Sequence, residues 1–441
     1  MNKTQLIAIG AVLLVVIAGA SAFMILSNDG EDKYRSSNTD FRLSILGNAD
    51  GNDYLDRDDI AKIQEMIDTD AEYSQMADAN NDGKIDAKDI AFLENILEVK
   101  EYNKGKADAD KRTAVINYID VDNEISSANY PVKKYVIVNT QRQLSLSIAL
   151  GIGDRVVGIT NHIQTYFDEN LFADFKDTPS MGTRDNPNLE LLAEVNADTI
   201  LSGPSTTYAK NITSTNQIPG KQLIRMASWE GANLATGALM LGFFTDADDA
   251  AESYVRWMDD LRVDIDEKLK TVDNVKATKF YLGTPTYLYA QNDGCSTALT
   301  WTGATNVGNI IQTNTAKSGI SVDDNVRVQV AQTGVDVYIY GAYLYTHESS
   351  QECQDKLTDK AVSFSERFPT TNAVKNNEIY VINYDLPFVI AELLGAYIMF
   401  DDVFSTNYVE SIIQEYLDRF CDVHDYQFNI DNFVQKYNAT A

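Results

Sequence analysis

A duplicated acidic loop constrains this 441-residue chain more than any other feature. The second copy runs from Asp78 to Asp89, and the first copy runs from Asn48 to Asp59. In both copies, oxygen-bearing side chains fall at positions 1, 3, 5, 9 and 12 of a twelve-residue loop, the spacing with which a loop wraps a calcium ion. The spacing predicts one Ca²⁺ site in each loop, and the alternative is a pair of metal-free, Asp/Asn-rich turns.

The predicted ligands are the side chains at these five positions and the main-chain carbonyl at position 7. They are Asn48, Asp50, Asn52, Tyr54, Asp56 and Asp59 in the first loop, and Asp78, Asn80, Asp82, Lys84, Asp86 and Asp89 in the second. Position 6 needs a positive φ and holds Gly83 in the second loop but Asp53 in the first. Because Asp enters the left-handed region less readily than Gly, we expect the first site to be weaker.

Each loop is followed by apolar residues at helical spacing: Ile60, Ile63 and Ile67 in one copy, and Ile90, Leu93 and Leu97 in the other. With Asp at position 12 and no entering helix of normal length, residues 41–100 resemble a type I dockerin. The resemblance implies a small all-α calcium-binding domain, related to paired EF-hands, that attaches to a cohesin-bearing protein through loop positions 10 and 11. These positions hold Arg57-Asp58 and Ala87-Lys88 rather than the Ser-Thr pair of cellulosomal dockerins, so the identity of a partner stays open.

The N-terminal residues 1–27 contain an uncharged stretch from Leu6 to Leu26, long enough as a helix to cross a hydrocarbon core of about 30 Å. Lys3 precedes this stretch and acidic residues follow it, which predicts that the C-terminal bulk lies outside the cell. An uncleaved single-pass anchor is favoured over a cleaved signal peptide, because the apolar run continues beyond the small residues around Ala22. We therefore expect a cell-membrane protein with a linker at residues 28–40.

The net charge of −29, from 36 basic and 65 acidic residues, argues against binding to nucleic acid. The three cysteines, Cys295, Cys353 and Cys421, allow either one disulfide with a free thiol or three buried thiols.

Beyond a predicted linker and hairpin at residues 101–130, short β-branched runs alternate with helical patterns through residues 131–441, which predicts an α/β architecture. Thr245 and Asp248 have the spacing of a capping box, and apolar residues then recur every three or four positions from Tyr254 to Val272. This pattern predicts a long strut helix at residues 246–273, between an N-lobe at 131–245 and a C-lobe at 274–441.

Three segments, at residues 150–159, 188–203 and 368–382, lie in order around the predicted strut helix. Together they resemble the class III substrate-binding proteins of ABC importers, the group that carries ferric siderophores, haem and cobalamin. The resemblance covers residues 131–437 and implies a two-lobed periplasmic-binding-protein fold. In that family a glutamate on each lobe docks onto the membrane permease. Glu190 matches the first, whereas Val328 stands at the place of the second, where Asp323 or Asp324 would have to replace it.

In such a fold the ligand lies between the lobes, against loops that leave the C-terminal ends of the strands. This rule selects His162, Tyr166, Arg184, Tyr208 and Trp229 on the N-lobe, and Tyr287, Tyr289, Trp301, Tyr343, Tyr345 and Tyr384 on the C-lobe. The aromatic character suits a bulky ligand such as a corrin, a porphyrin or an organic iron chelate, and Arg184 can pair with a negative charge on it. Ordinary packing is the alternative role for each of these tyrosines, because the chain contains 24.

These features together predict a non-enzymatic, extracellular solute-binding component of an ABC importer for an iron complex (siderophore or haem) or cobalamin, with a calcium-dependent dockerin for cohesin attachment. The chain has no Gly-x-Ser-x-Gly, phosphate-loop or His-Glu-x-x-His motif. Two alternatives remain: a dockerin-bearing surface scaffold or adhesion protein with a degenerate binding domain, and a dockerin-tethered hydrolase, which would need a carboxylate pair in its cleft.

Overall fold

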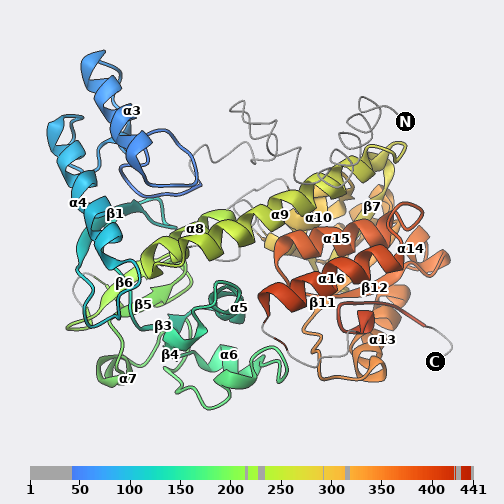
Figure 1. Ribbon diagram of the computed structural model, residues 1–441. Coiled ribbons are helices and arrows are strands. Elements are labelled where there is room, and N and C mark those ends of the chain that lie inside the picture. The colour runs from blue at the N-terminus through green and yellow to red at the C-terminus, as the bar shows by residue number, and fades with distance from the viewer. Residues whose placement is uncertain are drawn as a thin grey trace, which may run out of the picture.

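The computed structural model describes residues 42–213, 217–226, 234–291, 293–312, 318–421, 423 and 429–438. Helix α9 (Asp248–Leu269) runs along one side of the molecule from the N-lobe to the C-lobe, and the two predicted calcium loops lie in a module beside the N-lobe (Figure 1). The predicted membrane segment at residues 1–27 and the linker at 28–40 lie outside the described residues. Among the residues that are described, no helix has the length and apolar character needed to cross a membrane.

The calcium-loop module, residues 42–103, contains α3 (Arg57–Asp68), the 3-10 turn η1 (Gln75–Ala77) and α4 (Ala87–Asn103). Each long helix begins at loop position 10, because Asp56 or Asp86 at position 9 caps it and the aspartate at position 12 completes a capping box. Ile63 and Leu93 are fully buried in the core that the two helices share. The helices therefore lie where the apolar spacing predicts them.

Strands β1 (Ala114–Ile119) and β2 (Ile125–Tyr130) form an antiparallel hairpin. On one side, the Leu46 amide donates to the Asn117 carbonyl at 2.9 Å, which ties the hairpin to the module. On the other side, the amide of Asn129 donates to the side chain of Gln222 in the N-lobe at 2.6 Å. The predicted hairpin is therefore present, and its hydrogen bonds make it a bridge between module and lobe.

The N-lobe contains a parallel sheet in the order β4-β3-β5-β6. Its strands are β3 (Tyr135–Val138), β4 (Val156–Gly158), β5 (Thr199–Ser202) and β6 (Gln222–Arg225). The connecting helices are α5 (Gln141–Ala149), η2 (Gly153–Arg155), α6 (Asn161–Thr165), η3 (Ala173–Phe175) and α7 (Leu189–Glu194). Because β3 and β5 are buried along their whole length, the apolar runs of the sequence form the centre of this lobe.

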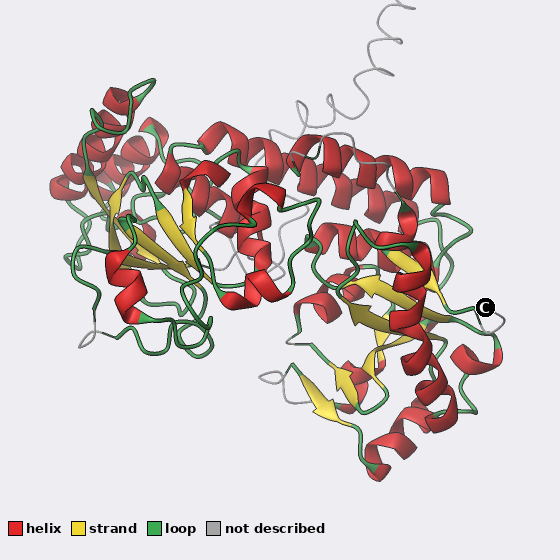
Figure 2. Ribbon diagram, turned by 90° about the horizontal axis from the view of Figure 1, so that it is seen from below, coloured by secondary structure: helices red, strands yellow, loops and turns green. Residues whose placement is uncertain are grey.

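The C-lobe sheet has the order β10-β8-β7-β11-β12-β13, with β9 also paired to β7. Its strands are β7 (Lys279–Thr284), β8 (Tyr287–Tyr289), β9 (Thr305–Asn306), β10 (Gly319–Ser321), β11 (Val337–Ala342), β12 (Ile379–Asn383) and β13 (Val434–Lys436). The helical segments are η5 (Val275–Ala277), α10 (Gly294–Trp301), α11 (Val307–Ile311), α12 (Asp324–Thr333), α13 (Ser350–Arg367), α14 (Asn372–Lys375), α15 (Phe388–Met399), α16 (Thr406–Phe420) and η6 (Ile430–Asn432). Figure 2 shows the two sheets as separate bodies, one in each lobe.

The strut helix α9 is preceded by a second helix, α8 (Leu234–Thr245), which the sequence reading did not predict. The predicted capping box is wrong for this reason: Thr245 ends α8 and its hydroxyl donates to the Leu241 carbonyl at 2.6 Å. The two helices pack closely, since a Cβ on Gly242 would lie only 2.4 Å from the Cβ of Ala251. Glycine at 242 therefore permits the α8–α9 hairpin.

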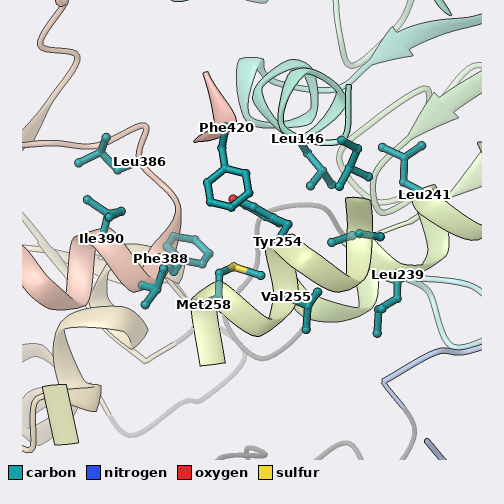
Figure 3. Close-up of a cluster of buried hydrophobic side chains, with 14 of the residues drawn as sticks. Leu146, Leu239, Leu241, Tyr254, Val255, Met258, Leu386, Phe388, Ile390 and Phe420 are labelled. Carbon is teal, nitrogen blue, oxygen red and sulfur yellow. The ribbon is translucent and has the colours of Figure 1, made fainter. Parts of the chain in front are cut away.

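One apolar core joins the lobes along α9, as Figure 3 shows. Tyr254 and Met258 of α9 lie between Leu146 of α5 on the N-lobe side and Phe388 and Phe420 on the C-lobe side. All five side chains are at most 5% exposed. Because this core is continuous, moving one lobe against the other would disrupt close packing, and the strut favours small movements.

Candidate ligand cleft and calcium loops

The lobes touch each other directly through loops that follow helix α6 and strand β11. The ring of Tyr166, after α6, stacks on the ring of Tyr343, after β11, with centroids 4.1 Å apart and planes 23° apart. Beside this pair, the Asp168 carboxylate accepts hydrogen bonds from the Thr346 amide at 2.6 Å and its hydroxyl at 2.7 Å. Asp168 and Thr346 are 4% and 5% exposed, so this contact between the lobes is shielded from water.

A second bridge between the lobes is made by Arg142 of α5. Its guanidinium donates to the Tyr384 carbonyl and lies 3.2 Å from the Asp385 carboxylate, both in the turn after β12. Burial raises the pKa of Asp385 to about 7, and Arg142 opposes this rise by favouring the charged form. The turn after β12 is therefore held to the first helix of the opposite lobe.

On the N-lobe, the structure brings His162, Tyr166 and Arg184 together. An Arg184 guanidinium nitrogen lies 3.3 Å from His162 Nε2, and the His162 ring meets the Tyr166 ring at 4.7 Å between centroids. The pKa of His162 is lowered to about 4, mainly because the ring is buried and secondly because the positive charge of Arg184 lies beside it. The imidazole is therefore neutral at neutral pH. Tyr208 differs from these residues because it is only 3% exposed and packs tightly over Gly203.

On the C-lobe, the predicted tyrosines form two groups. Tyr289 joins Tyr287 and Tyr384, with ring centroids 5.3 and 6.1 Å away, whereas Tyr345 stacks on His347 at 5.3 Å. Burial raises the pKa of Tyr289 and of Tyr345 to about 12, so both hydroxyls are protonated and can donate hydrogen bonds.

Among the described residues, one predicted ligand residue, Trp301, is not part of this cluster. Trp301 lies at the far end of α10, where the guanidinium of Arg262 in α9 covers its ring at 4.1 Å. The prediction of Trp301 as a cleft residue was therefore wrong, because α10 carries it away from the turn after β12. Trp229 lies outside the described residues.

The predicted ligand residues do not include the turn between β3 and α5 or the first turn of α5, which also lie at this lobe contact. Asn139, Gln141 and Gln143 are completely buried, yet Asn139 Nδ2 and both polar side-chain atoms of Gln141 and Gln143 lack a hydrogen bond of normal geometry. The Gln141 carboxamide approaches Tyr343 and Asp385 of the opposite lobe. The rule that selected the other loops applies equally to this one, since it follows the C-terminal end of a parallel strand.

The predicted calcium loops bury three carboxylates. Asp59, Asp78 and Asp89 are completely buried and accept main-chain N–H bonds, as from Asp56 to Asp59 at 2.9 Å and from Gly83 to Asp78 at 2.8 Å. Burial raises the pKa of Asp59 to about 7 and raises that of Asp89. A buried carboxylate is stabilised when a cation lies next to it, and these three occupy predicted ligand positions.

The asparagines of the two loops fit the same chemistry. Asn48 Oδ1 and Asn80 Oδ1, at positions 1 and 3, are buried without a hydrogen-bond donor. Across the described part of the chain, no three His, Cys, Asp or Glu side chains form a group that could hold a metal alone. An ion in these loops would therefore draw on amide and main-chain carbonyl oxygens as well as on carboxylates, as calcium loops do.

The two loops differ at position 6. Gly83 has φ +85° and Gly51, at position 4 of the first loop, has φ +78°, whereas Asp53 does not have a positive φ. The expectation that Asp53 adopts the left-handed conformation was wrong. Its carboxylate instead pairs with Arg42 at 2.5 Å, so the first loop uses Asp53 for an ion pair.

The predicted docking residues lie on the surface. Glu190 is exposed in the first turn of α7, while Val328 on α12 is 48% exposed. Asp323 caps α12 through the Val326 amide at 2.9 Å. Asp324, with 91% of its side chain exposed, is therefore the better placed of the two acids to present charge outward.

No protein-family profile matches the sequence, and no curated protein matches it. Solved structures do resemble it. FepB, a TroA-like periplasmic binding protein from Veillonella parvula, has a TM-score of 0.56 at 14% identity, over 73% of this chain and 99% of its own. The molybdate-binding protein MolA of a Haemophilus influenzae ABC transporter, bound to molybdate, has a TM-score of 0.54 at 14% identity. The match covers 69% of this chain and 97% of MolA. CeuE of Helicobacter pylori in a Ni–His complex has a TM-score of 0.54 at 14% identity. The match covers 70% of this chain and 97% of CeuE.

The chain thus has the two-lobed α/β fold of periplasmic binding proteins. More narrowly, it has the variant seen in FepB, MolA and CeuE, and the predicted fold of residues 131–437 is confirmed to that extent. The dockerin resemblance and the membrane anchor stay predictions.

Proposed function

We propose that this protein is the solute-binding component of an ABC importer and that its ligand is an iron chelate, haem or cobalamin. The observation that carries the proposal is the cluster at the lobe contact, where Tyr166 and Tyr343 from opposite lobes stack at 4.1 Å. Residues from both lobes that meet at one place can enclose a ligand, which is how two-lobed binding proteins capture solutes.

The chemistry of the cluster favours a bulky, metal-containing ligand. Half-buried tyrosines offer aromatic faces together with protonated hydroxyls, and Arg184 offers a positive charge beside a neutral His162. The structurally similar CeuE and MolA hold a Ni–His complex and molybdate, so this fold accommodates small metal-containing solutes.

A binding role also fits the cleft better than hydrolysis does. The two carboxylates at the lobe contact, Asp168 and Asp385, are engaged by Thr346 and Arg142. A glycosidase-type mechanism needs one carboxyl group to donate a proton and a second to act as nucleophile or base. These two are instead occupied in holding the lobes together.

For delivery, we propose that Glu190 and Asp324 dock onto the permease. Both are exposed on short surface helices, one on each lobe. A surface scaffold or adhesion protein is the second candidate function, and the observation that favours it is the exposed Val328 at the place of a docking glutamate.

We further propose that the chain is anchored by residues 1–27 with its bulk outside the cell, and that each loop binds one Ca²⁺. The second loop offers four carboxylates, Asp78, Asp82, Asp86 and Asp89, whereas the first offers three, Asp50, Asp56 and Asp59, because asparagine stands at its positions 1 and 5. Affinity rises with ligand charge, so the first site is the weaker one. A bound ion would neutralise the buried carboxylates. Residues 57, 58, 87 and 88 are exposed and so available to a cohesin-bearing partner.

A thermal-shift screen of the full chain against cobalamin, cobinamide, haem and ferric siderophores tests this function, because a ligand that binds only the folded state raises its stability. We expect a saturable shift with one ligand, lost in Tyr166→Ala and kept in Tyr102→Ala, whose tyrosine is exposed on α4 of the module. No shift across the panel would favour the scaffold function instead.

A further inference from the structure

The first calcium loop lies against the strut helix. Arg42, whose side chain is 6% exposed, donates from Nε and Nη2 to the Asp53 carboxylate at 3.0 and 2.5 Å. Its remaining terminal nitrogen, Nη1, contacts the Asp259 carboxylate of α9 at 2.7 Å. One buried guanidinium therefore joins loop position 6 to the middle of α9, with the bidentate geometry that makes such pairs strong.

The next loop residue makes a second contact with the same helix. Arg256 of α9 donates to the Tyr54 hydroxyl at 3.1 Å and also pairs with Glu252 at 2.5 Å. Tyr54 stands at loop position 7, where its carbonyl is a predicted calcium ligand. Consecutive residues of the loop, 53 and 54, thus hold one turn of the strut, and both lie inside the segment that a bound ion would order.

The second calcium loop has no comparable role. In the described residues, its hydrogen bonds and ion pairs stay within the module and hairpin, for example from the Asn117 side chain to the Ala79 carbonyl at 3.0 Å and from Lys88 to Asp82 at 3.1 Å. The module also contacts the start of α9 away from the loops, since Lys100 of α4 pairs with Asp248 at 2.9 Å. Between the module and the hairpin, Lys111 pairs with Asp246, in the turn before α9, at 2.6 Å.

We propose that calcium binding in the first loop is thermodynamically coupled to the docking of that loop on α9. Calcium would then clamp the module to the strut that joins the two lobes. The ion holds the loop in the conformation that presents Asp53 and Tyr54 to the helix. Conversely, the helix holds the loop in the conformation that binds the ion. The proposal rests on the calcium binding proposed above.

Coupling between two sites is reciprocal, so breaking the contact with α9 must weaken calcium binding by the same factor as loss of calcium weakens the docking. The contact can be broken without touching a calcium ligand, through Asp259→Asn. Glu267→Gln is the matched control, because Glu267 is exposed on the same helix and pairs at 2.5 Å with Lys270, the residue directly after that helix.

Calcium titration calorimetry of the full chain and both variants is the test, with circular dichroism to establish that each variant is folded. We expect two sites in the wild type and the control, and in Asp259→Asn a loss of affinity of about fivefold or more at the weaker site alone. Equal affinities in all three proteins would overturn the coupling and leave calcium binding intact, whereas no calcium binding in the wild type would overturn both.

Hydrogen exchange gives a second readout that does not depend on calorimetry. Calcium should slow amide exchange in the segment 252–262 of α9 in the wild type and in Glu267→Gln, but not in Asp259→Asn or Arg256→Gln. Slowing to the same degree in all four proteins would contradict the proposal, because it would show that calcium acts without the loop contacts.

Discussion

The rings of Tyr166 and Tyr343 stack across the two lobes with their centroids 4.1 Å apart. The N-lobe supplies one ring and the C-lobe the other, so the pair exists only when the lobes approach. A stacked aromatic pair contributes about 1 kcal/mol beyond the area that it buries. This contact therefore serves both as a brace between the lobes and as part of the surface that a ligand would meet.

Removing one ring of this stack should lower both stability and ligand affinity. We expect Tyr343→Ala to reduce the free energy of unfolding by about 1–3 kcal/mol, whereas Tyr343→Phe keeps the ring and loses little. Urea unfolding measures the first effect, and titration with the ligand found by the thermal-shift screen measures the second. If Tyr343→Ala and Tyr343→Phe had the same stability and the same ligand affinity, the aromatic ring would contribute to neither property.

The buried Glu392 should make stability depend on pH. It is completely buried on α15, and burial raises its pKa to about 8, although Arg262 at 3.2 Å opposes the rise. The folded state therefore holds this proton more tightly than the unfolded state does. The stabilisation is fully present below about pH 4.5, the ordinary value, and is lost as the pH rises through about 8.

The isosteric variant Glu392→Gln removes this titration. Unfolding free energies measured from pH 5 to 8 in saturating calcium should fall with pH in the wild type, by up to a few kcal/mol, and fall less in the variant. Parallel curves for the two proteins would show that Glu392 does not titrate in this range.

The tight α8–α9 hairpin should not tolerate a side chain at Gly242. A Cβ there would lie 2.4 Å from the Ala251 Cβ and 3.0 Å from the Ala247 carbonyl oxygen. We expect Gly242→Ala to lower the unfolding free energy by about 1–3 kcal/mol. The compensating change Ala251→Gly should recover part of this loss in the double variant, which chemical denaturation can measure. A double variant no more stable than Gly242→Ala would place the clash elsewhere.

Removing calcium should destabilise the module. A ligand present at a hundred times its dissociation constant stabilises the folded state by about 2.7 kcal/mol, so chelation should lower the unfolding temperature measurably. Asp89→Asn, in the loop with four carboxylates, should reduce this calcium response more than Asp59→Asn, in the loop with three. Identical melting of the wild type in calcium and in chelator would contradict the prediction of calcium sites.

Local features of the fold were predictable because they depend on neighbours in the sequence. Asp56 and Asp86, at loop position 9, cap helices that begin at the next residue, and the apolar spacing from Tyr254 onward places the strut helix. The sequence did not reveal α8, because that helix is apolar on all sides and has no periodic pattern to detect. Nor did it show that Asp53 avoids the left-handed region, because its partner Arg42 lies outside the loop.

The cleft was predictable only in part. The strand-end rule selected Tyr166 and Tyr343, which the structure brings together, but it also selected Trp301, which α10 carries to a contact with Arg262. The rule identifies which loops share an edge of a sheet, and it does not determine where the far end of a helix lies.

The sequence by itself determined the calcium-loop spacing, the helices that follow each loop, the α/β alternation and the long strut, since each depends on residue type and on short-range periodicity. Only the tertiary structure decided that Asp168 meets Thr346, that Arg142 reaches Asp385, and that Arg42 joins Asp53 to Asp259. These contacts join segments far apart in the chain, and they form because packing along one continuous core sets the distance between lobes, module and strut.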